Sequence, residues 1–402
     1  MVSLAPSVEK VFPVKSPLGR IGLACAIKRS YAIGGATGGK LSLADVQVPL
    51  VLFQDFERTA DGERRALLDD SDMLPVKDVT DVVLRGSAHA PERTRELYAG
   101  LSVSGFARRL RVVGERIAEV SAAGEVRFSS PEPFERLALD HRVAYGGYDA
   151  YAHEVLDPPP PPPVAAKGAG DLGPDLVTAV PSPRYPGIFA YPRNHAGVGY
   201  FIDLDRRRAD GAALPQVEDP EDMLTPERFF VPSPTAWIDA PIPGSFGWVA
   251  PAWYPRILRC AGPLLACDEP ARPLREAALG DGDDLVDPRG RPIGLLHPRA
   301  LNGASPGLAR ERLRGNEPVV LENLSARAPH MSFLLPGEQP RFSVRPPGLG
   351  VMTPKPVLQT LRIEPDHDRV ILTWIGVLPL AAAPPADFVD RTELSIGWTR
   401  ID

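Results

Sequence analysis

The sequence predicts a mainly β protein: an antiparallel β-sandwich or meander-rich architecture with few short helices and long loops rich in proline and glycine. Three observations predict this fold class. Proline occurs 47 times in 402 residues, and proline lacks a backbone donor and breaks helix interiors. Short apolar runs alternate with polar residues between glycine-rich turns. The hydrophobic (44%) and charged (24%) fractions are those of a folded globular protein.

In the first part of the chain, short strands are expected to follow one another through tight turns. Apolar runs on both sides of the glycine-rich turn at 34–39 predict a hairpin within 21–53. Leu110 and Val112 alternate with arginines, as in a strand that buries one face. The result would be an antiparallel meander, with further strands at 80–89, 109–112, 117–120 and 125–128.

The sharpest change of composition is the run of six prolines at 158–163. Such a run adopts an extended polyproline II helix of about 3.1 Å per residue, which acts as a semi-rigid spacer. We therefore expect residues 158–183 to be a linker or an exposed insert. It separates an N-terminal β-rich part, 1–157, from a C-terminal β-rich part, 184–402, although the two parts are also compatible with a single unit.

The C-terminal part is expected to contain more short strands and two short helices. Ser305 and Pro306 are a typical helix start, and Gly315 would end that helix. A second short helix is predicted at 272–279. The last predicted hairpin has a strand face of Val357, Leu361 and Ile363, a turn at 366–368 and a return strand at 369–376.

Charge and cysteine content exclude several classes of protein. The net charge of -6 lacks the basic footprint of a nucleic-acid binder. An odd number of cysteines, Cys25, Cys260 and Cys267, argues against a disulfide framework and favours buried free thiols in a reducing compartment. The N-terminus lacks the apolar core of a signal peptide, and no apolar run is long enough to span a membrane. We expect a cytoplasmic protein with no membrane insertion and no nucleic-acid partner.

We find no catalytic, metal-binding or cofactor-binding motif in the sequence. Residues 34–40 lack the Ser or Thr that would complete a phosphate-binding loop, so a hairpin turn is expected there. The seven histidines form no HExxH motif, and no GxSxG occurs. Acidic runs at 69–72 and 281–284 lack the spacing of a calcium loop and are expected to be solvated. We therefore predict no catalytic residues, no metal and no cofactor.

Aromatic residues stand beside glycines without catalytic partners, at 145–148, at 197–200 and around Trp248, Trp253 and Tyr254. Glycine permits close backbone approach, and an aromatic ring beside it either packs under the turn or forms a recognition surface. Both interpretations stay open at this stage.

Several segments occur in a specific order along most of the chain: 80–91, 131–134, 141–147, 214–218, PGSFGWVAPAWYPR at 243–256 and LRGNEPVVLENL at 313–324. Their order and spacing resemble a bacterial family of unknown function that is encoded beside the VgrG spike, PAAR tip and effector genes of type VI secretion. The resemblance implies structural roles for Gly146, Gly147, Asn194, Gly197, Gly199, Gly315, Glu317 and Asn323. The segment 194–200 departs from the family pattern, because His195 replaces a proline.

The resemblance implies a non-enzymatic adaptor or chaperone, which binds a PAAR-containing effector or tip protein and helps to load it onto the VgrG spike. Interfaces are often centred on aromatic residues and arginine, so the candidate contact residues are Trp248, Trp253, Tyr254 and Arg256. Two alternatives remain. One is a hydrolase with a site assembled from Glu132, Asp149 and Glu218, which a pocket with converging carboxylates or histidines would favour. The other is a structural component of the secretion particle.

Overall fold

The computed structural model describes residues 8–15, 21–34, 39–58, 64–157, 189–257, 298–385 and 387–401. Strands make up 44% of it and helices 11%, which confirms the predicted mainly β fold. The α-helix α1 (Ala150–Leu156) has seven residues, in agreement with the expectation of short helices. Short 3₁₀ turns lie at His141–Val143, Arg206–Ala209, Pro226–Arg228, Pro234–Asp239, Pro298–Leu301 and Pro365–His367.

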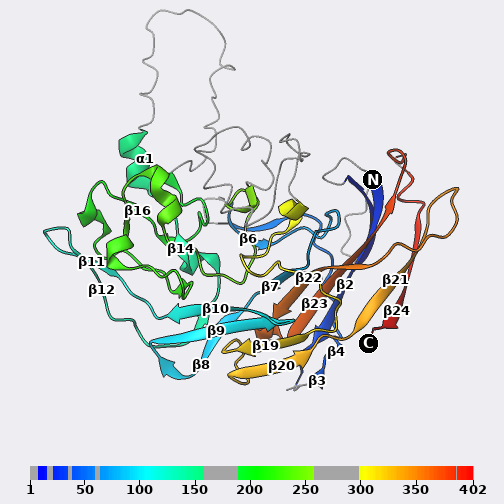
Figure 1. Cartoon of the computed structure of the whole chain (residues 1–402), viewed down its shortest axis with the longest axis horizontal. Helices are drawn as coiled ribbons and strands as arrows, with labels where there is room; N and C mark the ends of the chain where they lie inside the picture. The colour runs from blue at the N-terminus through cyan, green and yellow to red at the C-terminus, as the bar shows by residue number, and fades with distance from the viewer. Residues whose placement is uncertain are drawn as a thin grey trace, which may run out of the picture.

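The first six-stranded sheet combines strands from the beginning of the chain with β22 and β23 from its last fifty residues (Figure 1). Its strand β2 pairs antiparallel with β23 from Gly22↔Pro379 to Ala32↔Arg369, so strands from the predicted N-terminal and C-terminal parts are direct neighbours. The order is β1 (Glu9–Lys15), β2 (Ile21–Ala32), β23 (Arg369–Pro379), β22 (Val357–Glu364) and β7 (Asp81–Leu84), with β4 (Ser42–Leu43) beside β2.

The second six-stranded sheet also combines both parts of the chain. Its strand β9 pairs with β10 on one side and with β19 on the other, both antiparallel. The order is β17 (Val217–Glu218), β10 (Phe106–Val113), β9 (Glu96–Val103), β19 (Pro318–Glu322), β20 (His330–Leu334) and β3 (Gly39–Lys40). In β10 the arginines and the apolar residues alternate as the sequence predicted.

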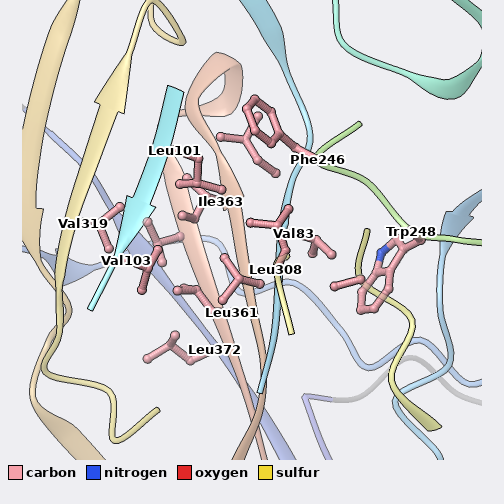
Figure 2. Packing of buried hydrophobic residues seen from close by; sticks show 14 of the residues in the cluster. Val83, Leu101, Val103, Phe246, Trp248, Leu308, Val319, Leu361, Ile363 and Leu372 are labelled. Atoms are coloured by element: carbon pink, nitrogen blue, oxygen red, sulfur yellow. The ribbon is translucent and has the colours of Figure 1, made fainter. Parts of the chain in front are cut away.

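The two large sheets share one hydrophobic core (Figure 2). Leu101 and Val319 of the second sheet pack in the same cluster as Leu361, Ile363 and Leu372 of the first. The opposite face of the first sheet is covered by a separate apolar cluster: Phe12, Val14, Ala24, Ala26, Leu50 and Ile375. A sheet that is buried on both faces needs strands that are apolar throughout, which explains the nearly continuous apolar runs of β2 and β23.

In the described part of the chain, six two-stranded sheets surround this core. They are β5 (Asp55–Arg58) with β6 (Arg64–Asp69), β8 (Ser87–Thr94) with β13 (Phe134–Ala138), β11 (Ala118–Val120) with β12 (Val126–Phe128), β14 (Tyr145–Gly146) with β15 (Val198–Gly199), β16 (Phe201–Ile202) with β18 (Phe230–Val231), and β21 (Glu338–Arg345) with β24 (Glu393–Arg400). A third apolar cluster, which includes Tyr145, Tyr191, Tyr200 and Phe229, fills the region between residues 118 and 240.

The helix predicted after Ser305 is wrong. The Ser305 backbone N–H and hydroxyl both donate to the Gly247 carbonyl, at 3.1 and 2.8 Å. Further along, the carbonyl of Leu308 accepts from the N–H of Val82, and that of Glu311 accepts from the N–H of Thr80. These backbone groups bond to Gly247, to β7 and to the residue just before β7, and therefore do not form the ladder of a helix.

The second half of the hairpin predicted within 21–53 is also wrong. Residues 46–53 form no strand. Side chains, and not a second strand, accept hydrogen bonds from backbone N–H groups in this region. The Gln47 amide accepts from the Ser30 N–H at 2.8 Å, and Asp72 accepts from the Val51 N–H at 2.7 Å.

The predicted strands at 117–120 and 125–128 and the hairpin of β22 and β23 are confirmed. The shared face predicted for β22 is wrong, because a register shift between Leu358 and Thr360 separates its two halves. Val357 packs against the cluster that covers the opposite face of the sheet, whereas Leu361 and Ile363 lie in the shared core.

Cys25 is a buried free thiol, as predicted, and burial raises its pKa to about 12. Several other predictions lie outside the described residues: the linker at 158–183, the helix at 272–279, the acidic loop at 281–284, Cys260 and Cys267.

Candidate functional site

The four residues predicted to contact a partner lie inside the folded chain. Trp248, Trp253, Tyr254 and Arg256 are 6%, 2%, 6% and 5% exposed. Trp248 and Trp253 belong to the core cluster that the two large sheets share. A partner can touch only exposed atoms. This segment is therefore part of the folded interior, and a partner would have to bind the chain at another surface.

A buried ion pair supports the ring of Trp248. Lys77 Nζ lies 4.9 Å from the indole centroid and 2.8 Å from Asp81 Oδ2, and both charged side chains are almost fully buried. Asp81 also accepts hydrogen bonds from the Asn302 side-chain amide and from the Gly303 N–H, both at 3.0 Å. The buried charges are therefore paired and hydrogen-bonded, which such groups require.

Arg256 is held by a second buried pair. Its guanidinium lies 2.7 Å from Asp70 Oδ2 and donates to the Val249 carbonyl at 3.0 Å. Burial alone would raise the pKa of Asp70, but the charges of Arg256 and Lys77 and a hydrogen bond from Gln54 lower it overall. Arg256 therefore neutralises a carboxylate of the interior.

Trp253 packs against two histidines. The rings of His141 and His195 lie 5.1 and 5.9 Å from its indole, measured between centroids. Burial lowers the pKa of each histidine to about 4, so both are neutral at neutral pH. Tyr254 meets Trp237 edge-to-face at 5.0 Å. Both aromatic residues thus hold neighbouring loops together.

Two of the glycine-containing motifs meet in space. Strands β14 and β15 pair in parallel, which aligns Gly146 with Gly199. Asn194 is fully buried between them and donates to the carbonyls of His141 and Tyr145, at 2.7 and 3.1 Å. A Cβ on Gly146 would lie 2.2 Å from the Asn194 carbonyl oxygen, so no larger residue fits. Gly147 and Gly197 approach each other in the same crossing of the backbones.

The remaining motif residues support the turns around β19. Glu317 accepts hydrogen bonds from the N–H groups of Arg314 and Gly315, and Gly315 lies against the ring of Trp374. Asn323 has a φ of 55° and donates from its side chain to the Tyr98 carbonyl at 2.9 Å. These contacts give each residue a structural role.

A pocket of about 230 Å³ lies where β6 and β7 meet residues 138–142. Its charged residues are already paired. Arg142 lies 2.6 Å from both Glu57 and Asp140. Asp366 is partly buried, yet hydrogen bonds from His89, Arg136 and Ser87 lower its pKa.

A serine–histidine contact also borders this pocket. The Nδ1 atom of His141 lies 3.4 Å from Ser245 Oγ, and both side chains are buried. A general base works best when its pKa is near the working pH. With a pKa of about 4, the imidazole of His141 is too weakly basic to activate a serine near neutral pH.

The three acids of the hydrolase alternative do not converge on the pocket. Asp149 caps α1 and is bound by Arg208, and Glu218 is bound by Arg111 and Arg116 at 2.6 and 2.9 Å. The side chain of Glu132 is exposed elsewhere. In the part of the chain that the structure describes, no group of three or more His, Cys, Asp or Glu residues is placed to hold a metal ion.

An exposed aromatic and arginine pair occurs instead on the outer face of the second sheet. Tyr98 is 38% exposed, and the guanidinium carbon of Arg109 lies 5.1 Å from its ring centroid. Arg109 also pairs with Glu322 at 3.3 Å. Val320 and Leu334, which are 41% and 38% exposed, continue this face across β19 and β20. We call these five residues the outer sheet face.

The model of a bacterial protein family matches residues 19–375, which include both large sheets except for β1 and the end of β23. The chain belongs to this family. It is DUF2169, described as an uncharacterized protein conserved in bacteria. No curated protein and no solved structure matches the chain.

In this DUF2169 chain, sequence reasoning missed the outer sheet face. The arginines at 108, 109 and 111 were visible, but their partners were not. In the structure Arg108 pairs with Asp219 and Arg111 with Glu96, whereas Arg109 covers the exposed ring of Tyr98. The alternation of β9 could have placed Tyr98 on the arginine face, because residues two apart share a face.

No helix in the described part is long and apolar enough to cross a membrane.

Proposed function

We propose that this protein is a non-enzymatic adaptor or chaperone of a type VI secretion system. In the cytoplasm it binds a PAAR-containing effector or tip protein and helps to load it onto the VgrG spike. Two arguments support the proposal. The first is the resemblance carried by the ordered segments of the sequence. The second, which carries most weight in the structure, is the outer sheet face, where an aromatic ring, an arginine and two aliphatic residues are exposed together.

The composition of this face suits a protein interface. Tyrosine and arginine are enriched among the residues that dominate binding energy, and each offers a large contact area with a polar group. Arg109 and Glu322 lie beside Tyr98 and provide charges of both signs at the rim of the patch. Such rim charges steer encounter and register more than they add affinity.

The hydrolase alternative has less support. Among the described residues, the acids that line the pocket form ion pairs with arginine or accept several hydrogen bonds. The pKa of His141, about 4, lies far below neutral pH. A structural component of the particle would behave differently from an adaptor. It would co-sediment with assembled spikes in fixed proportion, whereas an adaptor would be absent from them.

The test is to tag the full chain in its native host and to identify co-purifying cytosolic proteins by mass spectrometry. We expect a PAAR-containing effector or a spike protein. Changing Tyr98 and Arg109 together to alanine should reduce its recovery at least tenfold, while Tyr151→Ala should not. Tyr151 is a matched control, because it is 41% exposed and Arg208 lies 4.8 Å from its ring.

Three results would count against the proposal. Recovery of no secretion component from cytosol would reject the adaptor role. Equal recovery by the double variant would reject the outer sheet face as the binding surface. Stoichiometric presence in purified spikes would favour the structural alternative.

A further inference from the structure

The ribbon of β21 and β24 forms a boundary of the molecule on the side where the chain ends (Figure 1). The two strands pair antiparallel over their whole length, from Glu338↔Arg400 to Arg345↔Glu393. Among the described residues, β21 is the one strand that pairs with β24. The far side of β24 is therefore an edge of eight residues.

The ribbon is anchored by its inner face. Leu394, Ile396 and Trp398 are partly buried and pack against the core cluster of the two large sheets. The guanidinium carbon of Arg29 lies 3.9 Å from the ring centroid of Trp398. Because these contacts fix the strand, a partner that binds its edge would not have to order it first.

The backbone pattern shows which groups of β24 face outward. The N–H of Ile401, just after β24, donates to the carbonyl of Gly337, just before β21, at 2.9 Å, so Ile401 bonds across the ribbon. In an antiparallel pair the bonded residues alternate. Ser395, Gly397 and Thr399 therefore bond to β21, and the N–H and C=O groups of Leu394, Ile396 and Trp398 point to the edge. On β21 the same alternation leaves Val344 free to bond with Met352, as observed.

The edge of β24 lacks the features that usually prevent strand addition. Edge strands are commonly protected by proline, lysine or a bulge. Strand β1, at the edge of the first sheet, contains Pro13, Lys10 and Lys15. Strand β24 contains no proline or lysine, and its pairing with β21 has no register shift.

The outward surface of the ribbon has an uncompensated positive charge. Arg341 lies directly opposite Gly397 and is exposed, and no described carboxylate lies within ion-pair distance of it. A Cβ on Gly397 would have no atom within 4 Å, so the space above this glycine is open. Neighbouring strands lie about 4.8 Å apart, so a strand added beyond β24 would lie about 10 Å from β21. An extended arginine side chain covers most of this distance, so Arg341 can reach over Gly397 and meet a carboxylate side chain that extends back from the added strand.

We propose that the edge of β24 binds an extended segment of another protein as an added strand. The apolar residues of that segment continue the row of Leu394, Ile396 and Trp398, and a carboxylate opposite Gly397 pairs with Arg341. Main-chain hydrogen bonds supply affinity in such strand addition, and the side chains supply specificity. This surface is separate from the outer sheet face and does not require the partner to be a secretion protein.

The test uses the full chain and two fluorescein-labelled peptides of nine residues that alternate valine and threonine. The central threonine is replaced by glutamate in one peptide and by lysine in the other. In fluorescence anisotropy we expect the glutamate peptide to bind at least tenfold more tightly. Arg341→Glu should reverse this preference. Gly397→Lys should lower the affinity for the glutamate peptide at least tenfold. Arg127→Glu, at an exposed arginine of the ribbon formed by β11 and β12, should change neither affinity.

Hydrogen exchange distinguishes strand addition from a loose charge contact. The glutamate peptide should slow exchange at the amides of Leu394, Ile396 and Trp398 and leave those of Ser395 and Gly397 unchanged. Equal binding of the two peptides, no binding, or protection without this alternation would overturn the proposal. A chain that dimerises through β24 and excludes the peptide would overturn it as well.

Discussion

The imidazole of His141 meets the indole of Trp253 edge-to-face, with ring centroids 5.1 Å apart and an interplanar angle of 67°. The two residues come from segments more than a hundred positions apart, and His195 approaches the same indole at 5.9 Å. An aromatic pair of this kind adds about 0.5–1.5 kcal/mol beyond the area that it buries. Trp253 is therefore the point where the loops at 141, 195 and 253 are joined.

The first prediction is a loss of stability in mild acid. Burial holds the pKa of His141 and His195 at about 4 in the folded chain, below the ordinary value of 6.5. Between these values the unfolded chain binds protons that the folded chain does not, so stability falls as the pH decreases from 6.5 to 4. The loss is up to about 3 kcal/mol for each histidine. Urea unfolding at pH 7.5 and pH 5 measures it.

The control replaces His195 by glutamine, which does not titrate. This variant should lose less stability between pH 7.5 and pH 5 than the native chain loses, whatever its stability at pH 7.5. If the variant loses as much stability as the native chain, His195 binds its proton as readily in the folded chain as in the unfolded chain.

The second prediction concerns Trp253 and Tyr98, which differ in burial. Trp253→Ala should lower the free energy of unfolding by about 3–5 kcal/mol, because it leaves a large cavity in the core. Tyr98→Ala should change it by less than about 0.5 kcal/mol, as expected at the surface. Thermal or urea unfolding of the two variants measures whether each residue belongs to the core or to the surface. Comparable stability of both variants would mean that Trp253 is not a core residue.

The third prediction concerns the buried pair of Arg256 and Asp70. Arg256→Met leaves the carboxylate of Asp70 buried without its cation and should cost about 3–5 kcal/mol. The double change Arg256→Met with Asp70→Leu removes both charges and should cost clearly less than the sum of the single changes. Additive losses in urea unfolding would mean that the two side chains do not interact.

The sequence predicted the strands that alternate and missed the contacts that fold the loops. Strand β10 was recognisable because apolar side chains repeat along it with a strand period, and β23 because it is rich in β-branched and aromatic residues. The helix expected after Ser305 fails because its backbone bonds to β7, which is more than two hundred residues away. Local propensity does not contain such long-range hydrogen bonds.

The same limit applies to the candidate site. Aromatic residues beside glycines predict either core packing or a recognition surface, and only the fold decides between them. Trp253 is covered by His141 and His195, which are distant in sequence, whereas Tyr98 stays exposed under Arg109. The motif residues were identifiable by type, but the burial of Asn194 between two glycine segments appears only in the structure.

The last prediction concerns Gly146, where two motif segments cross. A Cβ there would lie 2.2 Å from the Asn194 carbonyl oxygen, a contact that only backbone movement can relieve. Gly146→Ala should therefore separate β14 from β15, weaken the hydrogen bonds from Asn194 to His141 and Tyr145, and cost about 1–3 kcal/mol. Gly397→Ala is the matched control: a Cβ there has no atom within 4 Å, and its φ is not positive. Urea unfolding should separate the two variants, and equal stability would mean that the crossing has room for a side chain.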